Sequence, residues 1–239
     1  MHSILITNDD GILADGIIRL AAAAKEFGEV WVAAPDGQRS AASHAITLHG
    51  TIDVYPQEFP VAGVKAFSLT GTPADCVRVG CLSLMPHMPD TVLSGINYGW
   101  NAATDLQYSG TAGAALEAAF QGVRGIAFSE AFSENHDAAD EYLRVLLEEL
   151  LESELGPGEI FNVNFPDSSR TGCRGILRDR KISESMIYRD RYRVIEKLER
   201  GGMRVMVDGQ YQEIAEPETD LAAIFAGYIS VSRVRNLGY

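Results

Sequence analysis

The sequence predicts an α/β fold, namely a Rossmann-like, doubly wound, mostly parallel sheet with a C-terminal β-rich extension or arm. Short runs rich in Ile, Val and Leu alternate with segments whose apolar residues recur at helical spacing. This alternation is typical of parallel strands joined by helices. A chain of 239 residues, 46% of them hydrophobic, is long enough to bury one large α/β core.

The elements follow from local patterns. The run at 3–7 predicts a strand buried on both faces, because it is short, apolar and rich in Ile and Leu. The helical spacing at 15–27 ends at Gly28, a residue suited to a helix C-cap. The next strand, 29–34, is stopped by a Pro-Asp-Gly turn. The same reasoning predicts further strands at 47–55, 65–69, 91–94, 125–129, 159–164 and 229–234, and helices at 74–85, 112–121, 137–155 and 219–228.

The pattern changes near Pro166, which predicts a Rossmann-like core at 1–166 and a β extension at 167–239. We expect the extension to serve oligomerisation and its final helix and strand to pack back on the core. From Arg170 to Arg204 there are eleven Lys or Arg residues against five Asp or Glu residues, in a chain with a formal net charge of −13.

This basic segment has two interpretations. The simpler one is a solvated β-hairpin or arm. The sharper one is an arm that docks on an acidic surface of a sister subunit, or that helps to gather polyanionic substrates. The large apolar residues of the segment favour an arm laid across a partner, and they are Ile182, Met186, Ile187, Tyr188, Tyr192, Val194 and Ile195.

Composition excludes several classes of protein. The net charge of −13 argues against a nucleic-acid duplex as the partner. No apolar run reaches the ~18 residues of a membrane span, and the N-terminus lacks the features of a signal peptide. The three cysteines have no CxxC spacing, so neither a disulfide framework nor a zinc site is expected. These observations favour a cytoplasmic protein with no membrane partner.

Polar residues follow three of the predicted strands, and in a doubly wound sheet the carboxyl ends of the strands bind ligands. Asp9 and Asp10 follow the first strand, Ser40 follows the second, and Asn97 and Asn101 follow the strand at 91–94. Two carboxylates ~4 Å apart repel by ~4 kcal/mol at an effective dielectric of 20, which a cation would relieve. Oxygen ligands of this kind suit Mg²⁺ or Mn²⁺. Each signal is weak alone, and the prediction depends on their coincidence.

The stretch Ser109-Gly110-Thr111 leads directly into a predicted helix. Free N–H groups and the positive end of the helix dipole make such a stretch a good cradle for an anion. A simple capped helix, with glycine for close packing, is an equally good interpretation of these residues alone. The motifs GxxxxGK and GxGxxG are absent from the chain, which argues against P-loop and dinucleotide-binding sites.

Six stretches spread along the chain carry a family resemblance, and they are ILITNDDG (4–11), APDGQRSAASHAITL (34–48), GTPADCV (71–77), SGINYGWN (94–101), YSGTAGAALEA (108–118) and TDLAAIFAGYISV (219–231). In content and order they resemble the SurE family of stationary-phase survival proteins, which are metal-dependent 5′-nucleotidases. The resemblance implies phosphomonoester hydrolysis, above all of nucleoside 5′-monophosphates and sometimes of polyphosphate. It also implies one divalent metal ion per subunit and a homodimer or homotetramer.

The resemblance also assigns residues. The metal ligands of the family match Asp9, Asp10, Ser40 and Asn97, the same four that follow the predicted strands. Asp9 and Asp10 are also the candidate catalytic residues, because a carboxylate beside the metal can orient the attacking water or accept its proton. The residues expected to bind the phosphate are Asn101, Ser109, Gly110 and Thr111.

The chain departs from the family pattern at three places. Ala41 stands where glycine is usual, and a positive φ is less comfortable for alanine. His44 replaces an asparagine, and Ser232-Arg233 replaces the usual Thr-Pro ahead of an unfamiliar tail, VRNLGY. The first two changes bear on substrate preference, and the third bears on the subunit interface.

Two other classes share features of this sequence. A signalling receiver domain also has an acidic pair after its first strand, but none of the four lysines stands where that class needs one, and the chain is too long. A non-catalytic nucleotide- or phosphate-binding regulatory module on the same fold remains an alternative.

Overall fold

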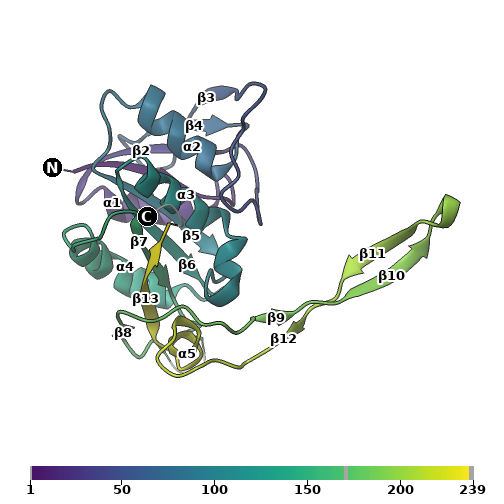
Figure 1. Cartoon of the computed structure of the whole chain (residues 1–239). Coiled ribbons are helices and arrows are strands. Elements are labelled where there is room, and N and C mark those ends of the chain that lie inside the picture. Colours follow the sequence, from purple (N-terminus) through teal and green to yellow (C-terminus); the bar gives the residue numbers. More distant parts are fainter. Residues whose placement is uncertain (1, 170–171, 237–239) are drawn as a thin grey trace.

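A mixed β-sheet with helices on both faces dominates the computed structural model, which describes residues 2–169 and 172–236 (Figure 1). Its helices are α1 (Asp15–Ala24), α2 (Pro73–Val79), α3 (Gly110–Phe120), α4 (Asp137–Leu150) and α5 (Asp220–Phe225). Its strands are β1 (His2–Thr7), β2 (Gly28–Pro35), β3 (Val54–Gln57), β4 (Lys65–Leu69), β5 (Thr91–Tyr98), β6 (Arg124–Glu130), β7 (Glu159–Asn164), β8 (Ile176–Leu177), β9 (Tyr188–Arg189), β10 (Tyr192–Lys197), β11 (Met203–Val207), β12 (Gln210–Tyr211) and β13 (Ile229–Arg235).

The order of the nine strands in the main sheet is β3-β4-β2-β1-β5-β6-β7-β13-β8. The six strands from β4 to β7 in this order run parallel, whereas β3 and β13 run antiparallel to their neighbours β4 and β7. The chain builds the sheet outwards from β1 in one direction and then crosses to β5 on the other side. Ligands bind where the strand order reverses in this way, so the ends of β1 and β5 frame the expected site. The predicted fold class is confirmed.

The two faces of the sheet are covered by different helices, because successive side chains of a strand point to opposite sides. In β1, Ile4 and Ile6 pack into a core cluster with Leu20 of α1 and with residues of α4. Leu5, between them, packs into a second cluster with Val77 of α2 and with residues of α3. The buried, apolar character of β1 therefore reflects a strand enclosed on both sides.

Several predicted boundaries were wrong. Of the predicted strand at 47–55 only Val54 and Tyr55 are in a strand, β3, which continues to Gln57, and Gly50 has a φ of +104°. The helices predicted at 15–27 and 137–155 end at Ala24 and Leu150, although partly buried apolar residues such as Phe27 continue the helical spacing beyond the last turn. The helix predicted at 74–85 is α2 followed by a π-helical turn. β5 extends beyond 91–94 to Tyr98, because its pairing with β6 resumes after a register shift.

Residues 188–211, which include the C-terminal part of the basic segment, form a long two-stranded projection (Figure 1). β9 pairs with β12 at its base, and β10 pairs with β11 farther out. After the projection, α5 and β13 return to the body, where β13 pairs with β7. The division at residues 166 and 167 stays a prediction. Arg170 and the last three residues of the tail lie outside the described residues.

Candidate functional site

The turn after β1 places two carboxylates side by side. Asn8 shapes this turn, because its Nδ2 donates to the Gly11 carbonyl at 2.8 Å and its Oδ1 accepts from the Gly11 N–H at 3.3 Å. Gly11 has a φ of +106°, which a residue with a Cβ rarely adopts. Asp9 and Asp10 therefore sit in a turn that is fixed by its own hydrogen bonds. The supporting role of Asn8 was not predicted from the sequence.

Asp9 is buried against the start of α3. The Thr111 hydroxyl donates to Asp9 Oδ1 at 2.6 Å, and a Cβ added to Gly110 would lie 3.0 Å from Asp9 Oδ2. Burial raises the pKa of Asp9 from 3.8 to about 6, although the hydrogen bonds from Thr111 act in the opposite direction, and the charge of Asp10 raises it further. The carboxylate is therefore held in place at a cost in desolvation.

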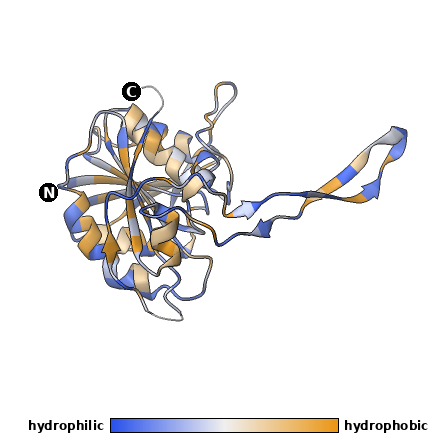
Figure 2. Ribbon diagram, turned by 60° about the horizontal axis from the view of Figure 1, so that its bottom comes forward, coloured by the Kyte–Doolittle hydropathy of each residue, from blue (hydrophilic) through white to orange (hydrophobic). Residues whose placement is uncertain are grey.

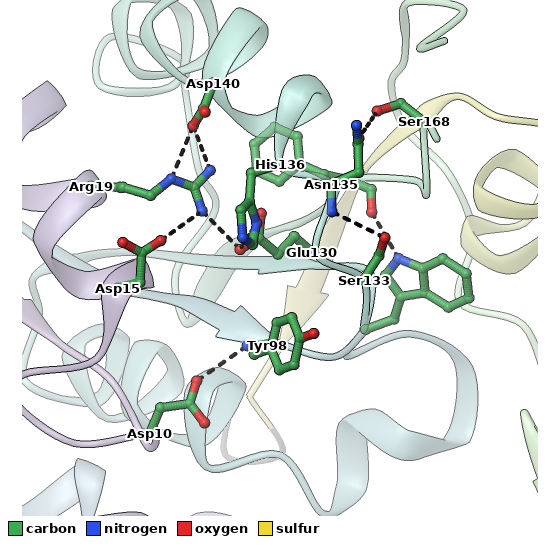
Figure 3. Close-up of polar contacts among 12 residues, drawn as sticks. Asp10, Asp15, Arg19, Tyr98, Glu130, Ser133, Asn135, His136, Asp140 and Ser168 are labelled. Atoms are coloured by element: carbon green, nitrogen blue, oxygen red, sulfur yellow. Dashed lines mark hydrogen bonds and ion pairs between the residues drawn. The ribbon is translucent and has the colours of Figure 1, made fainter. Parts of the chain in front are cut away.

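Asp10 is half-buried and contacts the end of β5. Its Oδ2 accepts from the Tyr98 backbone N–H at 3.1 Å (Figure 3). Burial raises the pKa of Asp10, and the bond from Tyr98 opposes that effect. Within the described residues, no Lys, Arg or His forms an ion pair with Asp9 or Asp10. Two partly desolvated acids thus lie together without a basic partner among these residues.

The loop after β2 reaches the same end of the sheet. The Arg39 N–H donates to the Asp9 carbonyl at 2.6 Å, which brings the neighbouring Ser40 to the acidic turn. Ser40 is exposed, and its Oγ accepts from Gln38 Nε2 at 3.0 Å. Ala41 has a φ of +58°, so the alanine does adopt the left-handed conformation for which the usual glycine is suited.

His44 ties this loop to α3. Its Nε2 lies 2.7 Å from Glu117 Oε2, and Arg78 donates to the other oxygen of Glu117 at 3.0 Å. Burial alone raises the pKa of Glu117, but the hydrogen bonds and charges of its partners, His44 first among them, lower it overall. The contact of His44 with a buried acid indicates a structural role in holding the loop.

Asn97 was predicted to lie in the loop after the strand at 91–94. In the structure it lies on β5 itself. After the register shift it pairs with Ser129 of β6, and its Nδ2 donates to the Gly99 carbonyl at 2.7 Å. In the part of the chain that the structure describes, Asn97 Oδ1 accepts no hydrogen bond. The oxygen of this amide is therefore available as a ligand.

Asn101 is drawn into a buried polar network beyond the end of β5. Its Nδ2 donates to Ser129 Oγ at 2.8 Å, and its backbone N–H donates to Asn164 Oδ1 at 2.8 Å. The Asn101 carbonyl accepts from the side chains of Asn162 and Asn164 in β7. The network fixes the loop that follows the site, and the part played by the β7 asparagines was not predicted. One hydrogen of Asn101 Nδ2 remains after the bond to Ser129.

Ser109 is the N-cap of α3. Its Oγ accepts from the Ala112 N–H at 2.9 Å, as the capped-helix interpretation expects. The hydroxyl keeps its own hydrogen, which it can donate to an anion. The predicted phosphate-binding role of Ser109, Gly110 and Thr111 therefore stays a prediction, although α3 does begin beside Asp9.

An ion cluster that includes the last residue of β6 lies near the end of β5 (Figure 3). Buried Glu130 accepts from Arg19 of α1 at 2.9 Å, and His136 Nδ1 lies 3.0 Å from the same carboxylate oxygen. Arg19 also donates to Asp140 of α4. The Glu130 carbonyl accepts from the Gly99 N–H at 3.0 Å. The cluster therefore anchors the strand ends that carry Asn97 and Tyr98.

Within residues 2–169 and 172–236, no group of three or more His, Cys, Asp or Glu side chains is arranged to hold a metal ion. The predicted ligand set contains only two such residues and completes itself with a hydroxyl and an amide. Chemically, the arrangement offers an acidic pair to a cation and the start of α3 to an anion. No helix in the described parts of the chain is both long and apolar enough to cross a membrane.

Comparison with known proteins decides between the families that share such a sheet. The family described as Survival protein SurE matches residues 4–186. The chain belongs to the SurE family. A protein of Symbiobacterium thermophilum named 5′-nucleotidase SurE is 40% identical over 239 residues, which cover 98% of this chain and 92% of the relative. A protein of the same name from Alkaliphilus metalliredigens is 38% identical over 236 residues, which cover 97% of this chain and 91% of that relative.

Solved structures agree. The crystal structure of the SurE protein from Aquifex aeolicus superimposes with a TM-score of 0.81 at 30% sequence identity, over 98% of this chain and 94% of that one. The resemblance seen in the sequence motifs is thus confirmed, as is the Rossmann-like SurE fold with its C-terminal β hairpins.

Proposed function

We propose that this SurE protein is a metal-dependent 5′-nucleotidase that hydrolyses nucleoside 5′-monophosphates to nucleoside and inorganic phosphate. The main support is the pair Asp9 and Asp10, which lie without a basic partner among the described residues and at the reversal point of the strand order. Such a pair needs a cation to offset its repulsion. The names of the relatives supply the substrate class.

The donor set fits Mg²⁺ or Mn²⁺, one ion per subunit. We assign Asp9, Asp10, Ser40 and Asn97 as its ligands, all of which offer oxygen. Each carboxylate keeps acceptor capacity beyond its described hydrogen bond, and Asn97 Oδ1 is turned away from the bond that its amide makes to Gly99. When bound, such an ion polarises a phosphoryl oxygen and lowers the pKa of a coordinated water.

The remaining groups are assigned to the phosphate. The N-terminus of α3 offers the Gly110 and Thr111 end of its dipole, and the Ser109 hydroxyl has a hydrogen to donate. We assign the second hydrogen of Asn101 Nδ2 to the phosphate as well. We assign acceptance of the proton of the attacking water to a carboxylate oxygen of Asp9 or Asp10.

Release of inorganic phosphate from AMP or GMP, with and without Mn²⁺, tests this proposal. We expect turnover that depends on Mn²⁺ and is lost on chelation. The alternative, a non-catalytic nucleotide-binding module, predicts AMP binding without phosphate release. AMP that remains intact in the presence of Mg²⁺ and of Mn²⁺ would refute the enzymatic function.

We also propose a homodimer or homotetramer in which the projecting arm lies on a sister subunit. The pairing of β10 with β11 places Tyr192 opposite Val207 and Val194 opposite Val205, and all four are exposed. Figure 2 shows apolar segments along the projection. An isolated apolar face on a two-stranded arm gains stability only when it is covered. A cytoplasmic location is likewise retained as a prediction.

A further inference from the structure

Two aromatic rings stand exposed beside the acidic turn. Tyr98, the last residue of β5, and Phe132, just after β6, pack against each other with ring centroids 4.4 Å apart and planes inclined at 45°. Phe132 is 81% exposed and Tyr98 is 39% exposed. Among the described residues, neither ring belongs to a hydrophobic core cluster. Exposed apolar rings next to a polar site are typical of a surface that binds a ligand.

The pair is continuous with the proposed metal site. The Tyr98 backbone N–H donates to Asp10 at 3.1 Å, and its neighbour Asn97 is a proposed ligand. Gly99, on the other side of Tyr98, accepts the Asn97 amide and is held to the Glu130 carbonyl. A substrate whose phosphate lies between the proposed cation and the start of α3 therefore has these rings on the β5 side of its phosphate site.

Phe132 also forms part of the wall of a cavity of about 390 Å³. Gly99 borders this cavity on the side of the site, and Tyr188 and Tyr211 border it at the base of the arm. Its volume lies in the range of pockets for small molecules. Asp105 also lines it, so the cavity repels a phosphate and accepts hydrogen bonds from hydroxyl or amino groups.

We propose that the Phe132 ring, supported by Tyr98, stacks on the nucleobase of the substrate, with the ribose towards the cavity and the phosphate between the proposed cation and the start of α3. This inference rests on the proposed function. Stacking uses the face of a base, which all bases share, so this subsite favours nucleotides over other phosphomonoesters without selecting one base strongly. Purines should be preferred over pyrimidines because their stacking area is larger.

The test compares AMP with ribose 5-phosphate, which carries the same phosphate and sugar without a base. In Phe132→Ala the ratio of kcat/KM for AMP to kcat/KM for ribose 5-phosphate should fall about tenfold, mainly through KM for AMP. Phe132→Tyr keeps a ring and should keep the ratio. Because Phe132 is so exposed, its substitution should leave folding intact.

Phe120→Ala is the matched control. Phe120 is 58% exposed and lies at the opposite end of α3 from Gly110, roughly 15 Å away at 1.5 Å per residue. It should leave the ratio unchanged. An equal ratio in the parent, Phe132→Ala and Tyr98→Ala would overturn the base subsite while leaving the nucleotidase function intact.

Binding of adenosine gives a readout that does not need hydrolysis. Saturation-transfer NMR should detect adenosine bound to the parent protein, with a signal that is strongly reduced in Phe132→Ala and retained in Phe120→Ala. If the parent hydrolyses neither AMP nor ribose 5-phosphate, the proposed function fails and this measurement still decides the subsite. Adenosine that binds Phe132→Ala as well as the parent would contradict stacking on this ring.

Discussion

Substitution of Gly110 by alanine separates the stability of the fold from the integrity of the site. Gly110 is the first residue of α3, and alanine at a helical position stabilises by roughly 0.4–1 kcal/mol because it reduces the conformational entropy of the unfolded chain. The added Cβ would lie 3.0 Å from Asp9 Oδ2, 3.1 Å from Asp9 Cβ and 3.3 Å from Pro73 Cγ. Ordinary contacts begin at 3.4 Å, so Asp9 must move by about 0.4 Å.

A shift of this size matters more to a ligand than to the fold. Metal–ligand distances are held to within about 0.2 Å, whereas the helix gain offsets much of the crowding. We therefore expect the free energy of unfolding of Gly110→Ala to lie within ~1 kcal/mol of the parent value. Its Mn²⁺ affinity should be at least ~10-fold weaker, a loss of ~1.4 kcal/mol in binding free energy. Calorimetric titration with Mn²⁺ and thermal unfolding measure the two quantities.

Gly37→Ala is the matched control for that experiment. Gly37 lies in the loop after β2 near the same acidic turn, but a Cβ there would meet none of the described atoms within 4 Å. It should bind Mn²⁺ like the parent. Parental Mn²⁺ affinity in a folded Gly110→Ala protein would refute the assignment of Asp9 as a ligand held by α3.

Three further predictions concern the acids, the helix cap and the arm. Asp9→Asn and Asp10→Asn should each abolish phosphate release at limiting Mn²⁺ yet unfold at the same or a higher temperature without metal, because each removes like-charge repulsion; turnover near the parental rate would exclude that residue as a ligand. Ser109→Ala should lose a cap worth ~1 kcal/mol and also weaken inhibition by inorganic phosphate about tenfold, whereas a change in stability alone would make Ser109 a structural cap. Replacing 192–207 by an Asn-Gly turn between Arg191 and Asp208, whose backbones are hydrogen-bonded at 2.8 Å, should shift the oligomer towards monomer in light scattering, and an unchanged mass would show that the arm is not the interface.

The sequence predicted the parts of the site that depend on local pattern. Asp9 and Asp10 were found because an apolar strand ends just before them, and Ser109 was found because small polar residues precede a helix. The rule that ligands bind at the carboxyl ends of the strands of a doubly wound sheet placed the loops after β1, β2 and β5 at one edge, without any knowledge of distances. The resemblance of the motifs to the SurE family then indicated which reaction a site at this edge catalyses.

Contacts between distant segments could not be predicted in this way. Asn97 was placed in a loop after the strand predicted at 91–94, but pairing with β6 resumes at Asn97 after a register shift. Asn101 was predicted only to bind the phosphate, since nothing local indicates that its backbone N–H donates to Asn164 of β7. The backbone N–H of Tyr98 carries no side-chain signature at all. These features depend on strand register and tertiary packing, which cannot be deduced from any short stretch of the sequence.

The hydrogen bonds that join the acidic turn to β5 and to α3 close very long loops. The Tyr98–Asp10 bond spans 88 residues of chain, and the Thr111–Asp9 bond spans 102. Loops of this length form late, because their closure entropy must be met before the contacts are made. The site is therefore assembled only when β1, β5 and α3 have already docked. A cation bound there is linked to the folding equilibrium of the whole core, and its binding free energy adds to global stability instead of stiffening a single turn.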